Sequence, residues 1–322
     1  MSINRIRKVA IVGATGQQGR HIVEHLLKAS QHTVTAITRE DSSATPATGV
    51  KVAKVNYDDQ ETLVAALKGQ DALIITMSVT APPDTSEKLV RAAAKAGVPW
   101  ILPDEWGIDG ANEQYGRDCF LGPPKKAIRD LIEELGVSKW IAVACGFWYQ
   151  YSLGTMKEMC GFDFQKREVT FYDDGTTKIN TSTWQQVARA VTSLLSMDVS
   201  ELDARFKNRF AYVSSFCVSQ KDMFESVKRV TGTSDNAWKI EYQPSSERVA
   251  EGRQAMQEGQ RFVGFVKVLY GRSFYPNGDA NFEAKHGLAN DVLGLMKEDL
   301  DECTRGAIEL SNKIAEGKRG SH

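Results

Sequence analysis

The chain has 322 residues, 42% of them hydrophobic, and its 40 basic and 41 acidic residues leave a net charge of −1. This balance, without a block of like charge, argues against a nucleic-acid or anionic-membrane surface. No apolar run approaches the roughly 18 residues that a membrane span requires. The five cysteines contain no C-x-x-C pair and the first strand begins near the N-terminus, so we expect a reduced cytoplasmic protein without signal peptide or metal site.

A glycine-rich turn near the N-terminus is the feature on which the rest of the chain depends. A β-branched run at 8–12 leads into Gly13, Gly16 and Gly19, and helical periodicity follows from residue 22. Gly13 would make the sharp turn, Gly16 would let a phosphate approach the backbone, and Gly19 would let the helix pack closely on the sheet. Although the spacing G-x-x-G-x-x-G is not the usual G-x-G-x-x-G, its position predicts a pyrophosphate site at a helix N-terminus. An ordinary turn is the alternative.

The second predicted strand, residues 32–39, ends where this architecture places the adenosine ribose. Its last residue is Arg39, whose guanidinium would pair with a 2′-phosphate and therefore favours NADP(H) over NAD(H). Glu40 and Asp41 follow directly, and an acidic residue here would instead bind a free ribose. A solvated surface arginine is the remaining alternative.

Four further strands are predicted at 50–55, 71–75, 99–102 and 140–144, and they alternate with helices around 60–68, 86–96 and 130–136. Such alternation is typical of a Rossmann-type doubly wound parallel sheet in the α/β class. The loop after the fourth strand, Thr76-Met77-Ser78-Val79, follows a strand carboxyl end and so belongs to the ligand crevice.

Beyond residue 150 the alternation fades. We expect a hairpin at 169–175, a strand at 210–218, and helices at 185–195, 220–230, 249–260, 292–296 and 307–314. Residues 1–150 would form the cofactor-binding domain, with 176–198 returning to it. Residues 151–175 and 199–319 would form a smaller, interleaved, α-rich substrate lobe, and 320–322 are interpreted as a cloning remnant.

Aromatic residues gather after predicted strand ends. Strand carboxyl ends line the ligand crevice, so this distribution predicts a flat apolar or aromatic substrate near the nicotinamide. The candidate substrate-binding residues are Trp106, Trp148, Tyr149 and Tyr151. An aromatic packing cluster between the two lobes is the alternative.

Three segments carry a family resemblance: the glycine-rich turn 13–19, Leu102-Pro103-Asp104-Glu105-Trp106-Gly107, and a K-x-x-I-R-x-x-I-E helix at 125–133. Together they resemble the NmrA-like and isoflavone-reductase-like branch of the atypical short-chain dehydrogenases, including its fungal CipA-like members. The resemblance implies an NADP(H)-binding fold and, in enzymatic members, reduction of aromatic secondary metabolites. It implies cofactor contacts by Gly13, Thr15, Gly16, Gln17, Gln18, Gly19, Arg39, Thr76, Met77, Ser78 and Phe147.

The catalytic lysine of that family falls on Lys125. No tyrosine is followed by lysine four residues later, so the Tyr-x-x-x-Lys pair of classical short-chain dehydrogenases is absent. An ammonium can donate a proton and stabilise a developing oxyanion beside hydride attack. The alternative is that Lys125 and the adjacent Lys126 are solvated residues at a helix start, and the sequence leaves open which of the two would face the nicotinamide.

Two positions depart from the family pattern. The family usually has P-S-E-F-G where this chain has Pro103-Asp104-Glu105-Trp106-Gly107, and an asparagine often stands where this chain has Gly146. Both changes lie at the substrate end, so the family's substrates do not transfer. We expect an NADPH-dependent reductase of a small aromatic, enone or quinone-like metabolite, a monomer or homodimer. The alternative is a non-catalytic NADP(H)-binding redox sensor that acts through a protein partner.

Overall fold

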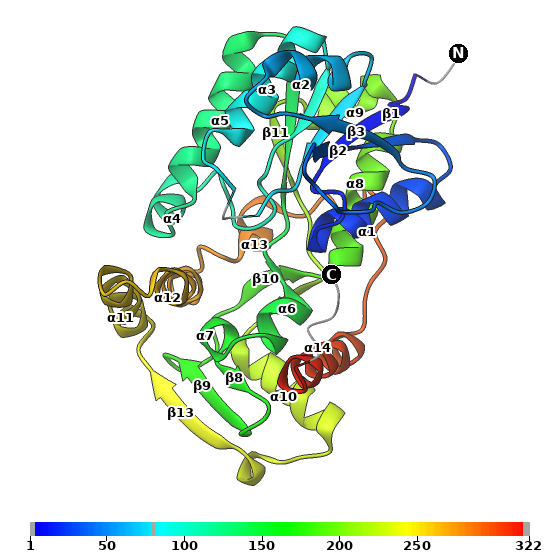
Figure 1. Ribbon diagram of the computed structural model, residues 1–322. Coiled ribbons are helices and arrows are strands. Elements are labelled where there is room, and N and C mark those ends of the chain that lie inside the picture. The colour runs from blue at the N-terminus through cyan, green and yellow to red at the C-terminus, as the bar shows by residue number, and fades with distance from the viewer. Residues whose placement is uncertain (1–3, 79–80, 318–322) are drawn as a thin grey trace.

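The computed structural model describes residues 4–78 and 81–317 as a larger and a smaller lobe (Figure 1). Val79 of the predicted crevice loop and residues 320–322 lie outside this described part. The larger lobe is built on one seven-stranded sheet and the smaller on two three-stranded sheets. Within the described ranges, each helix is too short or too polar to cross a bilayer.

The seven strands of the large sheet run parallel in the order β11-β6-β5-β4-β1-β2-β3. They are β1 (Lys8–Val12), β2 (Thr33–Arg39), β3 (Lys51–Val55), β4 (Ala72–Ile75), β5 (Trp100–Leu102), β6 (Lys139–Ala144) and β11 (Arg209–Tyr212). The strand order reverses between β1 and β4, whose carboxyl ends therefore open the crevice at which such sheets bind ligands. The predicted doubly wound Rossmann-type fold is confirmed.

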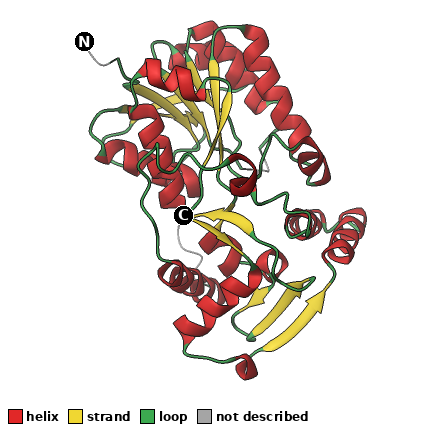
Figure 2. Ribbon diagram, turned by 180° about the vertical axis from the view of Figure 1, so that it is seen from behind, coloured by secondary structure: helices red, strands yellow, loops and turns green. Residues whose placement is uncertain are grey.

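Helices cover both faces of this sheet (Figures 1 and 2). One face carries α1 (Gln17–Lys28), α8 (Trp184–Ser196) and α9 (Val199–Phe206), and the other carries α2 (Gln60–Leu67), α3 (Thr85–Ala96) and α5 (Gly122–Leu135). Successive residues of β1 alternate between the two cores, because Val9 and Ile11 pack on the first face and Ala10 and Val12 on the second. Burial on both faces explains why the central strands β1, β4, β5 and β6 are nearly continuous apolar runs.

The smaller lobe holds the sheets β12-β10-β7 and β13-β9-β8. Their strands are β7 (Phe147–Trp148), β8 (Phe162–Asp163), β9 (Glu168–Tyr172), β10 (Ile179–Ser182), β12 (Phe216–Val218) and β13 (Lys239–Gln243). The helices of the described chain that have not yet been named are α4 (Glu113–Asp118), α6 (Tyr149–Gly154), α7 (Lys157–Cys160), α10 (Gln220–Thr231), η1 (Asp235–Ala237), α11 (Ser245–Gln257), α12 (Arg261–Ser273), α13 (Phe282–His286) and α14 (Leu300–Ala315). Aromatic side chains dominate the core of this lobe.

Three predictions for the second half of the chain are wrong. Residues 169–175 form no hairpin, because the antiparallel partner of β9 is the preceding β8 and its other neighbour, β13, runs parallel. The strand expected at 210–218 breaks at Ser214, whose side chain donates to Thr181 O and whose backbone N–H binds the Asn290 side chain. Residues 292–294 form a turn and 295–296 have no regular structure, so the predicted helix is absent, although Leu293 packs into the core of the large lobe.

Because the strand ends before Ser214, the observed boundary between the two lobes differs from the predicted one. β11 pairs with β6 at the edge of the large sheet, and Leu202 and Phe206 of α9 lie in the large core. Residues 199–213 therefore belong with the larger lobe and not, as predicted, with the smaller one. α8 likewise packs on the larger lobe, whereas β10 just before it pairs with β7 and β12.

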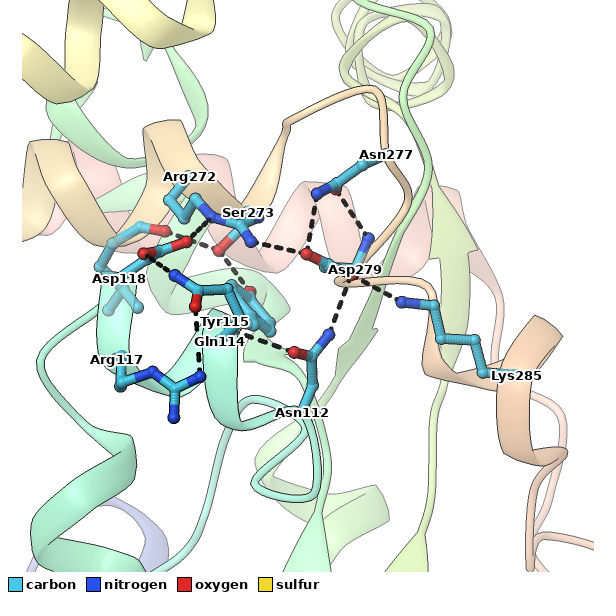
Figure 3. A network of polar contacts seen from close by, with 11 residues as sticks. Asn112, Gln114, Tyr115, Arg117, Asp118, Arg272, Ser273, Asn277, Asp279 and Lys285 are labelled. Atoms are coloured by element: carbon cyan, nitrogen blue, oxygen red, sulfur yellow. Dashed lines mark hydrogen bonds and ion pairs between the residues drawn. The ribbon is translucent and has the colours of Figure 1, made fainter.

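A buried polar network joins the lobes where α4 meets α12 (Figure 3). The Arg272 side chain is 5% exposed and donates to Asp118 at 2.7 Å and to Asp279 at 2.6 Å. The Tyr115 hydroxyl meets Ser273, and Asn112 donates to Asp279 at 2.9 Å. Because buried charges are stable only when they are paired, this network holds α4 against the smaller lobe.

Candidate active site

The glycine-rich turn between β1 and α1 is tightly constrained at two of its three glycines. Gly13 has φ +79°, and a Cβ there would lie 1.8 Å from the carbonyl oxygen of Thr76. A Cβ on Gly19 would lie 2.0 Å from the carbonyl oxygen of Gly13. Packing within the protein therefore requires glycine at both positions.

Gly16 is different, because it is exposed and forms the N-cap of α1. A Cβ built there meets, among the described residues, the carbonyl oxygen of Gly13 at 3.2 Å and otherwise faces open space. That space lies in front of the helix N-terminus, where free N–H groups and the helix dipole favour an anion. Its lack of a side chain therefore serves the approach of a ligand better than it serves packing.

Two neighbouring side chains hold this turn in shape. Thr76, directly after β4, donates its hydroxyl to Val12 O at 2.8 Å. Gln18 is 3% exposed and donates to Trp184 O at 3.2 Å, which ties α1 to α8. Thr15 and Gln17 are half-buried at the mouth of the turn. Thr76 thus holds the backbone at the start of the turn and Gln18 holds the first turn of α1 on α8, while Thr15, Gly16 and Gln17 keep part of their surface exposed.

Arg39 ends β2 with a side chain that is 70% exposed. Its Nε lies 3.4 Å from an Asp41 carboxylate oxygen. Burial raises the pKa of the neighbouring Tyr57, and the Arg39 charge opposes that rise. Because an ion pair this exposed contributes little, the guanidinium can exchange Asp41 for a phosphate.

The two lysines at the start of α5 point in different directions. Lys126 is exposed, and its Nζ binds the Asp130 carboxylate at 2.7 Å one turn along the helix. Lys125 is half-buried and stands one turn before Arg129, which forms a buried ion pair with Glu105. Residues four apart share a helix face, so Lys125 faces the segment after β5 and Lys126 faces solvent.

The positive charge of Lys125 acts to lower the pKa of two side chains, each of which follows a strand of the large sheet. Asp104 follows β5, and its Oδ1 accepts from the Met77 N–H at 3.1 Å. Burial raises the pKa of Asp104, while Lys125 and the Met77 N–H lower it. Burial also raises the pKa of the Cys145 thiol to about 12, against the effect of Lys125. The Lys125 ammonium therefore acts on a carboxyl after β5 and on a buried thiol after β6.

The aromatic candidates divide into two groups. Trp148 and Tyr151 are half-buried and, with Trp184, have ring centroids 6.1–6.2 Å apart, and Trp184 also stacks on His21 at 5.7 Å. The Trp106 indole donates to Ile75 O at 2.7 Å, at the end of β4. Trp106 thus lies at the carboxyl end of β4, and the cluster of Trp148, Tyr151 and Trp184 lies next to α1.

The second aromatic group fills the core of the smaller lobe. Tyr149 is 1% exposed and its hydroxyl meets Thr304 at 2.7 Å. Phe147 is also buried and stacks on Tyr270 at 4.3 Å.

Gly146, at the position where the family pattern has asparagine, has φ +66°, and a Cβ there would lie 2.0 Å from Asn180 O. This backbone contact excludes a side chain at Gly146.

Sequence reasoning did not select Trp184 or Arg129 as site residues. The signal for Trp184 was weak, an aromatic residue directly after the Thr183 N-cap of α8. Arg129 lies in the helix motif itself, but its buried partner Glu105 is 24 residues away. Only the fold shows that this pair fixes the face of α5 that carries Lys125.

Comparisons with known proteins agree with this architecture. The profile of the NmrA-like family matches residues 6–264. The chain is 25% identical over 308 residues to Oxidoreductase aprR of Aspergillus flavus, covering 94% of this chain and 99% of that protein. It resembles the structure of AtPrR2 with NADP+ and (+)pinoresinol at TM-score 0.73 and 20% identity, over 94% and 98% of the two chains. It resembles the NADPH-dependent quinone oxidoreductase QOR2 complexed with NADPH, from Escherichia coli, at TM-score 0.69 and 20% identity, over 92% and 98%.

Proposed function

The chain belongs to the NmrA-like family, and from this premise we propose that it is an NADPH-dependent reductase of a small aromatic, enone or quinone-like metabolite. The observation that carries the proposal is the meeting of an open helix N-terminus and a half-buried lysine at one edge of the large sheet. Two structural relatives were solved with NADP+ or NADPH, one together with pinoresinol and the other a quinone oxidoreductase. One of them thus binds the phenolic compound pinoresinol and the other is named for the reduction of quinones, which supports the substrate class.

The residues at the crevice fit NADPH. The open space at Gly16 and the backbone N–H groups of the first turn of α1 would receive the pyrophosphate. Arg39, exposed at the end of β2, would bind the 2′-phosphate. Met77, with its amide fixed by Asp104, would border the nicotinamide end. Bound NADPH is the source of the hydride.

Lys125 would complete the reduction. Hydride addition to a carbonyl or conjugated carbon leaves negative charge on the substrate oxygen, and the ammonium would stabilise that charge and donate a proton to it. The resulting amine would regain its proton from water at the mouth of the crevice. Lys126 is unsuited to this role because Asp130 binds it on the solvent side.

The test is NADPH oxidation with a panel of quinones and aromatic enones, for the wild type, Lys125→Met and the matched control Lys126→Met. General acid catalysis typically contributes about 10²–10⁴-fold, so kcat of Lys125→Met should fall by that factor while Lys126→Met stays near wild type. Equal rates for wild type and Lys125→Met would remove Lys125 from the mechanism. Tight NADPH binding without reduction of any compound would favour the non-catalytic sensor.

A further inference from the structure

We propose that Asp104 is a charged positioning residue that links the loop after β4 to Lys125 across the crevice. The inference rests on the proposed function and deepens it. The carboxylate of Asp104 accepts the Met77 N–H at 3.1 Å, so it fixes the loop that would border the nicotinamide. The family pattern has serine at this position. A serine hydroxyl could accept the same N–H but would carry no charge toward the lysine.

The neighbouring residue shows that the segment after β5 packs against α5. Glu105 is buried and pairs with the equally buried Arg129 of α5. Lys125 stands one helical turn before Arg129 on the same face, and its positive charge lowers the pKa of the Asp104 carboxyl in that segment. Arg129 is also held between the rings of Phe210 and Trp140, at 4.9 and 5.5 Å. The helix therefore has little freedom to turn Lys125 away from Asp104.

The two groups interact through charge and not through a direct ion pair. Among the described residues, Lys125 has no carboxylate oxygen within 4.0 Å, whereas Lys126 binds Asp130 at 2.7 Å. The ammonium protons of Lys125 thus stay available to a substrate oxygen. A direct ion pair would occupy the same protons.

Four influences act on the Asp104 carboxyl. Burial raises its pKa, Lys125 and the Met77 N–H lower it, and the Glu105 carboxylate raises it. A raised pKa means that the carboxylate forms only above the ordinary pH range of aspartate, and protonation at lower pH removes its charge. The link between Met77 and Lys125 should therefore weaken as the pH falls through the pKa of Asp104.

The direct test needs no substrate. In protein labelled with ¹³C at aspartate carboxyl carbons, the NMR resonance that disappears in Asp104→Asn identifies Asp104. Because the Lys125 charge lowers the pKa of Asp104, its removal in Lys125→Met should raise the titration midpoint of Asp104 by about one pH unit or more. Lys126→Met is the matched control and should leave the midpoint unchanged, and Lys125→Gln repeats the measurement if the methionine variant folds poorly.

An Asp104 midpoint that does not move in either Lys125 variant would overturn the proposal. This result is distinct from failure of the proposed function, in which NADPH oxidation is absent with every quinone and enone. Once a substrate is reduced, the acid limb of kcat/KM against pH should disappear in Asp104→Ser and return in Asp104→Glu. A Ser variant whose pH profile superimposes on that of the wild type would also reject the role.

Discussion

Replacing Gly16 and Gly19 by alanine, one at a time, separates a ligand-binding role from a packing role within one turn. A Cβ on Gly19 would lie 2.0 Å from Gly13 O, whereas an ordinary carbon–oxygen contact is about 3.3 Å or longer, so α1 must move by more than 1 Å. Overpacking of this kind typically costs about 1–3 kcal/mol. We therefore expect Gly19→Ala to lower the stability of the fold.

Gly16→Ala should leave the fold nearly intact. Its backbone, φ −71° and ψ 174°, suits any residue, and its Cβ would be 3.2 Å from Gly13 O. The new methyl group would instead stand where the phosphate approaches. Losing one hydrogen bond to a charged group costs about 1.5–3 kcal/mol, which corresponds to roughly 10- to 150-fold weaker NADPH binding.

Calorimetric titration with NADPH and thermal unfolding measure the two effects separately. Gly306→Ala in α14 is the matched control, because its Cβ meets Gln150 at an ordinary 3.7 Å and alanine favours a helix interior by about 1 kcal/mol. Gly16→Ala should keep the wild-type melting temperature within a few degrees and lose affinity. If Gly16→Ala binds NADPH as tightly as wild type, no phosphate sits at this helix N-terminus and the reasoning fails.

Three other outcomes are expected. Arg39→Ala should weaken NADPH binding about 10- to 100-fold and leave NADH binding unchanged by calorimetry; equal losses would exclude a 2′-phosphate contact. Arg272→Met removes the buried guanidinium from two partly buried carboxylates, Asp118 and Asp279, of which Asp279 keeps Lys285, so denaturant unfolding should show a loss of about 3 kcal/mol, and an unchanged midpoint would contradict this. Burial raises the pKa of Asp279 but Lys285 and Arg272 lower it to about 2, so the stability it contributes is present above pH 3.8 and lost toward pH 2. Asp279→Asn should therefore flatten the acid limb of unfolding relative to wild type, and identical limbs would count against the network.

Local pattern was sufficient for the first six strands of the large sheet. The central strands β1, β4, β5 and β6 are almost entirely buried, so they are nearly continuous apolar runs, and Gly97 ends α3 at φ +75° as a C-cap should. In the smaller lobe β10 reads Ile-Asn-Thr-Ser, which has no strand pattern. Its polar residues are buried because distant partners bind them: Asn180 accepts from Glu283 N, and Ser182 donates to Cys145 O. Such partners cannot be read from sequence spacing.

Two neighbouring tyrosines of the candidate site also have partners that sequence spacing does not reveal. Tyr149 and Tyr151 both follow the β7 strand, and sequence placed both at the substrate. Because α6 begins at Tyr149, residues two apart point to nearly opposite sides of the helix. Tyr149 turns toward Thr304 of α14, and Tyr151 turns toward Trp148 and Trp184. The partner of Tyr149 is 155 residues away, so sequence could not distinguish the two.

The placement of Lys125 runs against the preferences of its own helix. The first turn of α5 contains no acidic residue, and a cation near a helix N-terminus costs roughly 0.3–1 kcal/mol. Yet the surroundings fix this turn firmly: Pro123 and Pro124 set its backbone, and Gly122 packs against Gly116 so closely that a Cβ would lie 2.8 Å from its Cα. A rigid support that presents a locally unfavourable charge is typical of functional sites. Helix stability alone would favour aspartate or glutamate at residue 125, and the proposed use of the ammonium in reduction would account for lysine there.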